Sequence, residues 1–458
     1  MSYEKEVVQS QGVCCANTRT LDHFCGNGSL IKGNMRSRCN SCGAEVHAEA
    51  WKSNDNPPRV YMRKYCPTHG VTSSRISSDA RFYYNVSDGK ACGCEPGGCK
   101  PSTIGENAST ASTLHTCTLV VEIVRDCNLA CPTCYADSPQ REAGAHGTNL
   151  SIDDLASQVN NVIAKQGKID ILQLSGGEPT LHPKIFELIS WATAHEGISQ
   201  ILLNTNGVRL AEESFVAKLA TVVPKGKFGI YLQYDGADEP GQFLLRGGDF
   251  RKIREKALMN CRKYSLPVAL VMTVTHDNKF SCATAINYAL QDDNIPWIVF
   301  QPEFLSGRND KSKLLEVPIN VADVVHSVAQ GSLMALDSWI PLPCSDPNCG
   351  TVGFLVRMGG VWCSASKLID LSSLTHLIAN RMNFDVDFNV NTCGCDNYEL
   401  ADYLTQYGVK REDIKMVFVK PFMDTRTWDS ARIASCCTHV LTPTGEVDSF
   451  CRFYGLKT

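Results

Sequence analysis

The stretch that decides the fold is VRDCNLACPTCYADS, residues 124–138, which continues directly from the apolar run LVVEIV at 119–124. It places three cysteines, Cys127, Cys131 and Cys134, in a C-x3-C-x2-C array. A closed metal site usually has four protein ligands, so three thiols predict a site with one open position. The open site could belong to a catalytic zinc ion. It could also belong to a [4Fe–4S] cube whose fourth iron is free for another ligand.

Apolar runs and amphipathic segments alternate through residues 116 to 335 around this loop. Strands are expected at 119–124, 169–174, 201–204, 229–234, 268–274 and 297–301. Helices are expected at 152–165, 183–194, 210–221, 249–263 and 281–290. Because each strand precedes a helix, the pattern predicts βα units around a parallel sheet. Six such strands predict a whole or partial barrel, whose active site forms at the C-terminal ends of the strands.

Two further motifs end the second and third expected strands: LQLSGGEPTLHP at 172–183 and NTNG at 204–207. With an aromatic residue, Tyr135, after the third cysteine, this arrangement resembles the radical S-adenosylmethionine (radical SAM) superfamily. The resemblance implies that Cys127, Cys131 and Cys134 hold a [4Fe–4S] cluster and that S-adenosylmethionine supplies the fourth ligand. The barrel would then be a partial (β/α)6 barrel of the TIM type.

The same resemblance implies a binding site for the methionine part of the cofactor. Its members would be Tyr135, Gly176, Gly177, Glu178, Pro179, Asn204 and Thr205. The glycines would let the backbone approach the ligand closely, and Glu178 would supply the charge opposite the amino group. Standing alone, GGEP would be read as an ordinary strand-to-helix turn. Asn204 and Thr205 could equally cap the following helix.

The motif YLQYDG, residues 231–236, supplies two more candidate catalytic groups besides Glu178. Alternation along a strand puts Gln233 and Asp235 on one face, toward the barrel mouth, where Gln301 and Glu303 are also expected. An equally good interpretation makes Asp235 a turn residue before Gly236.

Two short knuckles near the N-terminus predict a separate metal site. Cys39 and Cys42, then Cys66 and His69, each present two ligands from a tight turn. Three sulfurs and one nitrogen are typical of a zinc-ribbon or rubredoxin-like site that holds zinc or a single iron. A histidine in this position could also be a plain exposed side chain.

The remaining cysteines predict one or two auxiliary [4Fe–4S] clusters. One ligand set would be Cys92, Cys94, Cys99 and Cys117, and a second would be Cys344, Cys349, Cys437 and Cys451. The chain has 23 cysteines, many in short-spaced groups. In a reducing compartment, metal ligation explains them better than disulfides do.

Within the superfamily, the chain resembles the tetraether lipid synthases and the related class D methyltransferases. The resemblance rests on CP-x-HG, HTC, YLQYDG, FQPEFLSGR, PCSDPNC and FMDTRTWD followed by CCTHVLTPTGEVDSFC. The linker departs from that pattern, since Cys92, Cys94 and Cys99 replace its C-x3-C-x2-C. Additional cysteines stand at 363, 393 and 395.

The composition of the chain argues against nucleic acid as a partner and against a membrane-spanning segment. A net charge of −4 over 458 residues gives no basic surface for nucleic acid, and no apolar run reaches the 18 to 20 residues of a membrane span. The N-terminal sequence lacks the features of a secretory signal, so we expect a cytoplasmic protein. A lipid substrate would need an apolar groove, for which the candidates are Phe354, Leu355, Val356, Met416, Val417 and Phe418. Core packing would explain these six equally well.

The expected organisation is an irregular segment (1–35), the Cys/His module (36–75), a cysteine-rich linker (76–115), the barrel (116–335) and an irregular cysteine-rich C-terminal region (336–458). The expected function is reductive cleavage of S-adenosylmethionine and hydrogen abstraction from an sp3 carbon of a small or lipid-like molecule, leading to a C–C bond. A flavodoxin or ferredoxin type protein would supply electrons. The alternatives are a peptide-modifying maturase and a multi-cluster electron carrier.

Overall fold

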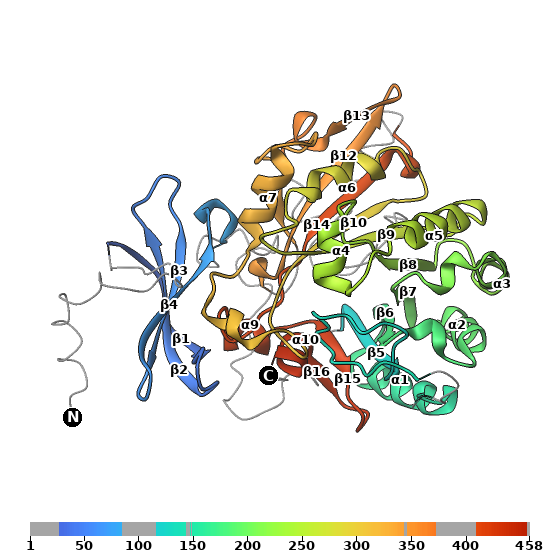
Figure 1. The fold of residues 1–458 in the computed structure, drawn as a ribbon, viewed down its shortest axis with the longest axis horizontal. Coiled ribbons are helices and arrows are strands. Elements are labelled where there is room, and N and C mark those ends of the chain that lie inside the picture. The colour runs from blue at the N-terminus through green and yellow to red at the C-terminus, as the bar shows by residue number, and fades with distance from the viewer. Residues whose placement is uncertain are drawn as a thin grey trace.

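The computed structural model describes residues 27–84, 116–142, 147, 149–342, 346–371 and 409–455. The predicted ligands Cys92, Cys94, Cys99 and Cys344 and most of the predicted linker lie outside these ranges. The described residues form a four-stranded sheet and a larger sheet of twelve strands. Figure 1 shows the small sheet in blue, standing beside the large one.

The small sheet is an antiparallel meander with the order β1-β2-β3-β4. Its strands are β1 (Gly28–Arg38), β2 (Glu45–Ser53), β3 (Val60–Cys66) and β4 (Gly70–Ser77). Its larger apolar cluster has five buried side chains: Met35, Ala48, Ala50, Val60 and Met62. A core of this size stabilises little, so this sheet needs additional ties such as a metal site.

The large sheet contains the six predicted strands in sequence order and in parallel. They are β5 (Thr118–Val124), β6 (Ile169–Gly176), β7 (Ile198–Thr205), β8 (Phe228–Gln233), β9 (Val268–Val274) and β10 (Trp297–Pro302). The predicted helices are α1 (Ile152–Gln166), α2 (Ile185–Ala194), α3 (Glu213–Val222), α5 (Arg251–Lys263) and α6 (Ser281–Ala289). Two helices between residues 116 and 335 were not predicted: α4 (Glu239–Arg246) and α7 (Val321–Ala329). The described part therefore has the radical SAM type of α/β architecture that the sequence predicts.

The prediction that the chain is irregular after residue 336 is wrong for the described residues. The strands there are β11 (Ile340–Pro341), β12 (Thr351–Met358), β13 (Val361–Ser364), β14 (Ile414–Val419), β15 (Thr438–Leu441) and β16 (Val447–Ser449). Two short helices accompany them, α9 (Ser430–Ala434) and α10 (Phe450–Gly455). Strand β14 pairs in parallel with β10, and β15 pairs in parallel with β5. The C-terminal region thus extends the barrel sheet at both edges, because these edges offer unpaired backbone groups.

The inner face of the large sheet changes character along its strands. Toward the strand starts it carries apolar side chains such as Ile171, Leu202 and Val271, which form one buried cluster. The next inward positions, two residues further along, are Gln173, Asn204 and Thr273. The barrel is therefore packed at its base and polar near the C-terminal ends of its strands.

The six apolar candidates for a lipid groove belong to the packing on the two faces of this sheet. Phe354, Leu355 and Val356 lie on β12, and Met416, Val417 and Phe418 lie on β14. All except Met416 are buried, and Met416 packs against the inner cluster. Core packing therefore accounts for them. Within the described ranges, no helix is long and apolar enough to cross a membrane.

Candidate active site

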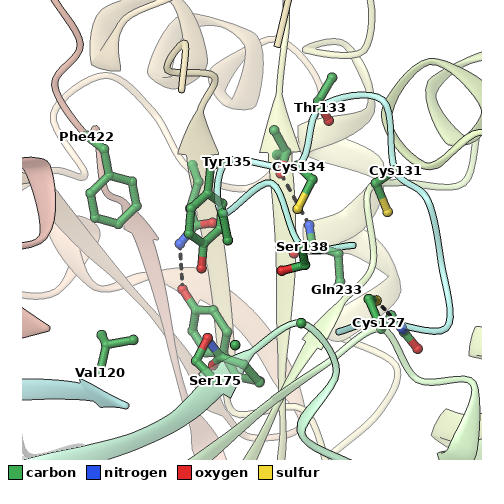
Figure 2. Close-up of a pocket in the computed structure, with 18 of the residues that line it drawn as sticks. Val120, Cys127, Cys131, Thr133, Cys134, Tyr135, Ser138, Ser175, Gln233 and Phe422 are labelled. Carbon is green, nitrogen blue, oxygen red and sulfur yellow. Dashed lines mark hydrogen bonds between the residues drawn. The ribbon is translucent and has the colours of Figure 1, made fainter. Parts of the chain in front are cut away.

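A cavity of about 190 Å³ lies at the C-terminal ends of the barrel strands. The loop after β5 contributes Cys127, Cys131 and Cys134, and Figure 2 shows all three on the same side of the cavity. The GGE turn after β6 and the NTN segment at the end of β7 line it as well. The two motifs that were expected to meet at strand ends therefore share one cavity.

The cysteine loop is held in shape by hydrogen bonds rather than by regular structure. The amide of Leu129 donates to Cys127 Sγ at 3.4 Å, and the amide of Cys134 donates to the carbonyl of Cys131 at 3.3 Å. From the segment after β10, Arg308 donates to the carbonyls of Cys131 (3.2 Å) and Ser138 (2.5 Å). One arginine thus ties the middle of the loop to its C-terminal end, which sequence reasoning did not foresee.

The three thiols suit a cluster better than a single ion. Within the described residues, Cys127, Cys131 and Cys134 are not gathered within 4.8 Å of one another, and no histidine or carboxylate joins them as a fourth ligand. Cysteines that bind different irons of a cube stand further apart than ligands of one zinc ion. The donor set therefore fits a [4Fe–4S] cluster with one iron left open.

The two glycines of the GGE turn are required by the cysteine loop itself. A Cβ atom at Gly176, where φ is +121°, would lie 2.0 Å from the carbonyl oxygen of Val124. One at Gly177 would lie 2.1 Å from the carbonyl oxygen of Asp126. The amide of Gly177 donates to Val124 at 2.8 Å, and that of Glu178 donates to Asp126 at 3.1 Å. From the sequence, the backbone of these glycines was expected to lie close to a bound ligand. In the structure it lies close to the residues where the cysteine loop begins, Val124 and Asp126.

The Glu178 side chain is buried, lines the cavity and is held by several donors. Its carboxylate accepts from both the amide and the hydroxyl of Thr180, from the hydroxyl of Thr205 at 2.8 Å and from the amide of Asn206 at 2.8 Å. Burial raises the pKa of Glu178, and these donors oppose that effect. The carboxylate consequently links the second and third strand ends.

The neighbouring predicted residues have structural partners of their own. Pro179 is buried as the first residue of a short 3-10 helix, Pro179–Leu181. Asn204 donates to Ser175 at 3.2 Å and lines the cavity. Neither Asn204 nor Thr205 caps the next helix, because α3 begins only at Glu213 with Glu212 at its cap. The capping alternative is therefore wrong.

Asp235 lies behind the cavity wall instead of at the barrel mouth. Its side chain is fully buried, its φ is +60°, and it forms ion pairs with Arg246 (2.6 Å) and Arg254 (3.4 Å). Burial alone would raise the pKa of Asp235, but the two arginines outweigh it and lower the pKa. Of this group, Gln233 and Arg246 line the cavity. The carboxylate of Asp235 accepts from Gln233 at 2.6 Å, so Asp235 is a positioning residue for both.

Tyr135 belongs to an aromatic wall of the cavity. Its ring lies 5.9 Å from that of Phe304, 5.7 Å from Phe450 and 4.8 Å from Tyr454, measured between centroids. Burial raises the pKa of the Tyr135 hydroxyl well above its usual range. The tyrosine after the third cysteine thus anchors the loop against C-terminal residues.

The N-terminal knuckles meet away from this cavity. The ligand atoms of Cys39, Cys42, Cys66 and His69 all lie within 4.8 Å of one another. Cys66 Sγ lies 3.5 Å and Cys39 Sγ 3.7 Å from His69 Nδ1, and the sulfurs of Cys42 and Cys66 are 3.9 Å apart. This compact set of three sulfurs and one nitrogen fits one tetrahedral zinc or iron ion.

Comparison with known proteins agrees with this geometry. Residues 121–283, which include the cysteine loop and the GGE turn, match the model of the radical SAM superfamily. The chain contains a radical SAM domain. Residues 31–78 match a second model, described as the HMPTM N-terminal zinc ribbon domain.

Several known proteins match the chain to different extents. The 7,8-dihydro-6-hydroxymethylpterin dimethyltransferase of Methanocaldococcus jannaschii is 25% identical, over 86% of this chain and 88% of its own. The Fe-coproporphyrin III synthase of Methanosarcina barkeri is 30% identical over 42% of this chain and 45% of its own. The mycofactocin maturase MftC of Mycobacterium tuberculosis is 29% identical over 31% of this chain and 33% of its own. A crystal structure of Streptococcus suis SuiB has a TM-score of 0.37 at 17% identity, covering 46% of this chain and 45% of that one.

The C-terminal cysteines beside the radical SAM domain differ from the predicted set. Cys349, Cys436 and Cys451 line one small cavity of about 20 Å³. Cys437 instead packs into the inner core cluster together with Cys117, and the amide of Cys117 donates to its carbonyl at 3.0 Å. Cys436 and Cys437, the two residues before β15, thus have different surroundings. Cys436 therefore replaces Cys437 beside Cys349 and Cys451, and Cys117 lies at the base of the barrel.

Several residues that line the radical SAM cavity were not singled out from the sequence. Arg246 ends α4, Lys420 follows β14, and Phe422 comes two residues later. Asn206, inside the quoted NTNG, donates to Asn128 at 2.7 Å and reaches Cys127 Sγ at 3.8 Å. Only Asn206 had a local signal, because the other three reach the cavity through long-range packing.

Proposed function

We propose that this protein is a radical SAM enzyme that forms a C–C bond by methyl or alkyl transfer to an sp3 carbon of a small molecule. The observation that carries the proposal is the meeting of three cysteines and the GGE turn in one cavity. A [4Fe–4S] cluster held by Cys127, Cys131 and Cys134 would supply the electron for reductive cleavage of S-adenosylmethionine, the chemistry that permits hydrogen abstraction from a C–H bond. Electrons would come from a flavodoxin or ferredoxin type protein in the cytoplasm.

The described residues would bind and orient the cofactor in this proposal. Cys127, Cys131 and Cys134 would hold the cluster. Arg246 lines the cavity as a cation, with only 11% of its side chain exposed, and could pair with the methionine carboxylate. Asp235 would keep that guanidinium in place.

The cofactor contacts predicted from the superfamily remain part of the proposal: Tyr135, Gly176, Gly177, Glu178, Pro179, Asn204 and Thr205. The carboxylate of Glu178 is fully engaged by protein donors on one oxygen, while the other accepts only from the amide of Asn206 among the described residues. That second oxygen could accept from the amino group of S-adenosylmethionine.

The choice of methyl or alkyl transfer rests on similarity. The match to the Methanocaldococcus relative covers most of both chains. The name of that relative describes a dimethyltransferase that acts on a pterin. This supports transfer to a small molecule over coupling of lipids. The maturase alternative is supported less, since its match covers only 31% of this chain.

The remaining metal sites and the domain boundaries are proposed on similar grounds. The zinc ribbon would hold zinc or iron, and the C-terminal cysteines would hold an auxiliary cluster with Cys349, Cys436 and Cys451 among its ligands. The predicted division into 1–35, 36–75, 76–115, 116–335 and 336–458 is kept, with one qualification. Strands β14 and β15 from the last part belong to the barrel sheet.

The test is cleavage of S-adenosylmethionine by protein reconstituted with iron and sulfide under anaerobic conditions and reduced with dithionite. We expect 5′-deoxyadenosine from the unsubstituted protein and none from Cys131→Ala. The matched control is Cys282→Ala, which removes a buried thiol in α6 outside the cavity. Equal product from Cys131→Ala and the control would refute the proposal.

A further inference from the structure

Three cysteines of the C-terminal region share one small cavity. Cys349, Cys436 and Cys451 all line a space of about 20 Å³. Within the described residues they are not gathered within 4.8 Å of one another, as the ligands of a single metal ion would be. Under the proposed function, on which this inference rests, they belong to an auxiliary [4Fe–4S] cluster, in which each cysteine binds a different iron.

Two of these sulfur atoms accept hydrogen bonds. Arg432 on α9 donates from Nη2 to Cys349 Sγ at 3.8 Å. The amide of Met423 donates to Cys451 Sγ at 3.4 Å. Hydrogen bonds to the cysteine sulfurs are among the factors that set the reduction potential of an iron–sulfur cluster. Donors of the kind that tune a cluster are therefore directed at the sulfurs.

The positive charge of Arg432 is only partly balanced by carboxylates. Its side chain is 11% exposed, and Nε lies 3.7 Å from Asp346 Oδ1, beyond hydrogen-bond distance. This Nε–H group is buried and has no hydrogen-bond partner among the described residues. The carboxylate of Asp429, which also acts on Arg432, is itself paired with Lys32 at 2.7 Å. A buried cation in these surroundings favours a further anion, which a metal–thiolate centre would supply.

A second cation lines the same cavity. Lys420 lies in its wall, where its ammonium group donates to the Thr438 hydroxyl at 3.1 Å. Among the described residues, no carboxylate lines this cavity. An iron–sulfur cluster with thiolate ligands is anionic, and it becomes more negative when it gains an electron. Buried cations beside it therefore favour the reduced state.

The wall of this cavity is shared with the radical SAM cavity. Lys420, Phe422, Thr438 and Phe450 line both. The ring centroids of Phe422 and Phe450 are 4.2 Å apart, so the two rings pack against each other within this wall. One layer of side chains thus separates the two sites, and the redox state of the C-terminal centre bears on the chemistry beside it.

We propose that Arg432 is a positioning residue of the C-terminal metal centre, whose guanidinium orients the Cys349 sulfur and raises the reduction potential of the cluster. Asp346 opposes this effect, because its carboxylate offsets part of the charge of Arg432. The two side chains together set the potential.

The test is a redox titration of the anaerobically reconstituted full chain, followed by electron paramagnetic resonance. The signal of the C-terminal centre is the one that Cys349→Ala removes. The signal of the radical SAM cluster is the one that S-adenosylmethionine alters. We expect Arg432→Gln to lower the equilibrium constant for reduction of the C-terminal centre about tenfold or more, a shift of about 59 mV for one electron. Asp346→Asn should shift the potential in the opposite direction.

The matched control is Arg262→Gln, which breaks an ion pair with Asp292 at an exposed position of α5 and should leave both potentials unchanged. Thermal melting verifies that each variant is folded, and Asp346→Asn still tests the inference if Arg432→Gln does not fold. Equal potentials in Arg432→Gln and the control, a shift of Asp346→Asn toward lower potential, or the absence of any signal that depends on Cys349 would overturn the inference. Formation of 5′-deoxyadenosine tests the proposed function separately, so the two can fail independently.

Discussion

Lys64 of the small sheet donates a hydrogen bond of 3.0 Å to the main-chain carbonyl of Arg426, which lies 362 positions further along the chain. The same Nζ atom also donates to the carbonyl of Thr425 and to the side chain of Asn40. The Lys64 side chain is fully buried, so one ammonium group joins the zinc ribbon to the segment after β14.

Replacing Lys64 with methionine should therefore weaken this junction. The carbonyls of Thr425 and Arg426 would stay buried without a donor, which costs about 1–3 kcal/mol each. We expect a loss of about 2–6 kcal/mol in the free energy of unfolding, measured by chemical denaturation. Lys52→Met, at an exposed position on β2, is the matched control. Equal stability of the two variants would show that the junction does not depend on Lys64.

Removing one ligand of the ribbon site should affect the ribbon and leave the catalytic site unchanged. Cys42→Ala leaves three of the four ligands that lie within 4.8 Å of one another. We expect the loss of one metal equivalent per chain and a lower melting temperature of the ribbon, because metal binding contributes directly to folding. The absorption of the core cluster should not change. An unaltered metal count would contradict the four-ligand assignment.

Adding one methyl group at the GGE turn should disturb the cysteine loop. In Gly177→Ala the new Cβ meets the backbone of Asp126 at 2.1 Å, so the turn and the loop must move apart. We expect a loss of about 1–3 kcal/mol in the free energy of unfolding and weaker binding of S-adenosylmethionine. Gly33→Ala is the control, because its Cβ meets only a Leu30 side chain, at 3.7 Å. Equal affinity for S-adenosylmethionine in both variants would show that the close approach is not needed.

The side chain of Asp79 should make stability depend on pH at the acid end. It is fully buried, and it pairs with Arg81 (2.5 Å) and with His326 on α7 (2.8 Å). Burial would raise the pKa of Asp79, but these partners outweigh it and lower the pKa from 3.8 to about 2. The folded state thus favours the ionised form, so the stabilisation is complete above pH 3.8 and is lost as pH falls toward 2.

Asp79→Asn should consequently cost about 2 kcal/mol at pH 6, and the difference from the unsubstituted protein should shrink as pH is lowered toward 2. Comparing the two proteins at each pH cancels the contribution of the metal ligands. A difference that stays constant between pH 6 and pH 2 would mean that Asp79 acts through shape alone.

The proposed chemistry predicts transfer of hydrogen from substrate to cofactor. With a substrate deuterated at the reacting sp3 carbon, mass spectrometry should find deuterium in 5′-deoxyadenosine and a new C–C bond in the product. Unlabelled 5′-deoxyadenosine accompanied by a product that has gained sulfur would place the enzyme in another branch of the superfamily.

The sequence predicted the central barrel well, because strands β5 to β10 are apolar runs bounded by helices with clear periodicity. It did not predict β14 and β15 as barrel strands. These are short, and their partners, β10 and β5, are distant in sequence, so local pattern holds no information about the pairing. The same reason explains why Cys436, and not Cys437, lines a cavity with Cys349 and Cys451, since this depends on how the segment before β15 packs.

The residues of the candidate site were likewise predicted only in part. The cysteine loop and the GGE turn were found because their spacing is local. Asp235 was expected at the barrel mouth, yet two arginines from α4 and α5 draw its carboxylate into the protein. Arg246 and Lys420 reach the cavity only in the folded chain, so nothing in their sequence neighbourhood marks them.

The position of β14 and β15 has a consequence for synthesis on the ribosome. The six central strands emerge before residues 409–455, so each edge of their sheet waits for a partner that this later segment supplies. Until then, both outer strands expose unpaired backbone groups, which is the condition under which nascent chains aggregate or bind chaperones. Maturation of the metal centre would therefore follow completion of translation, since Lys420 and Phe422, which complete the cavity wall, arrive with the same late segment.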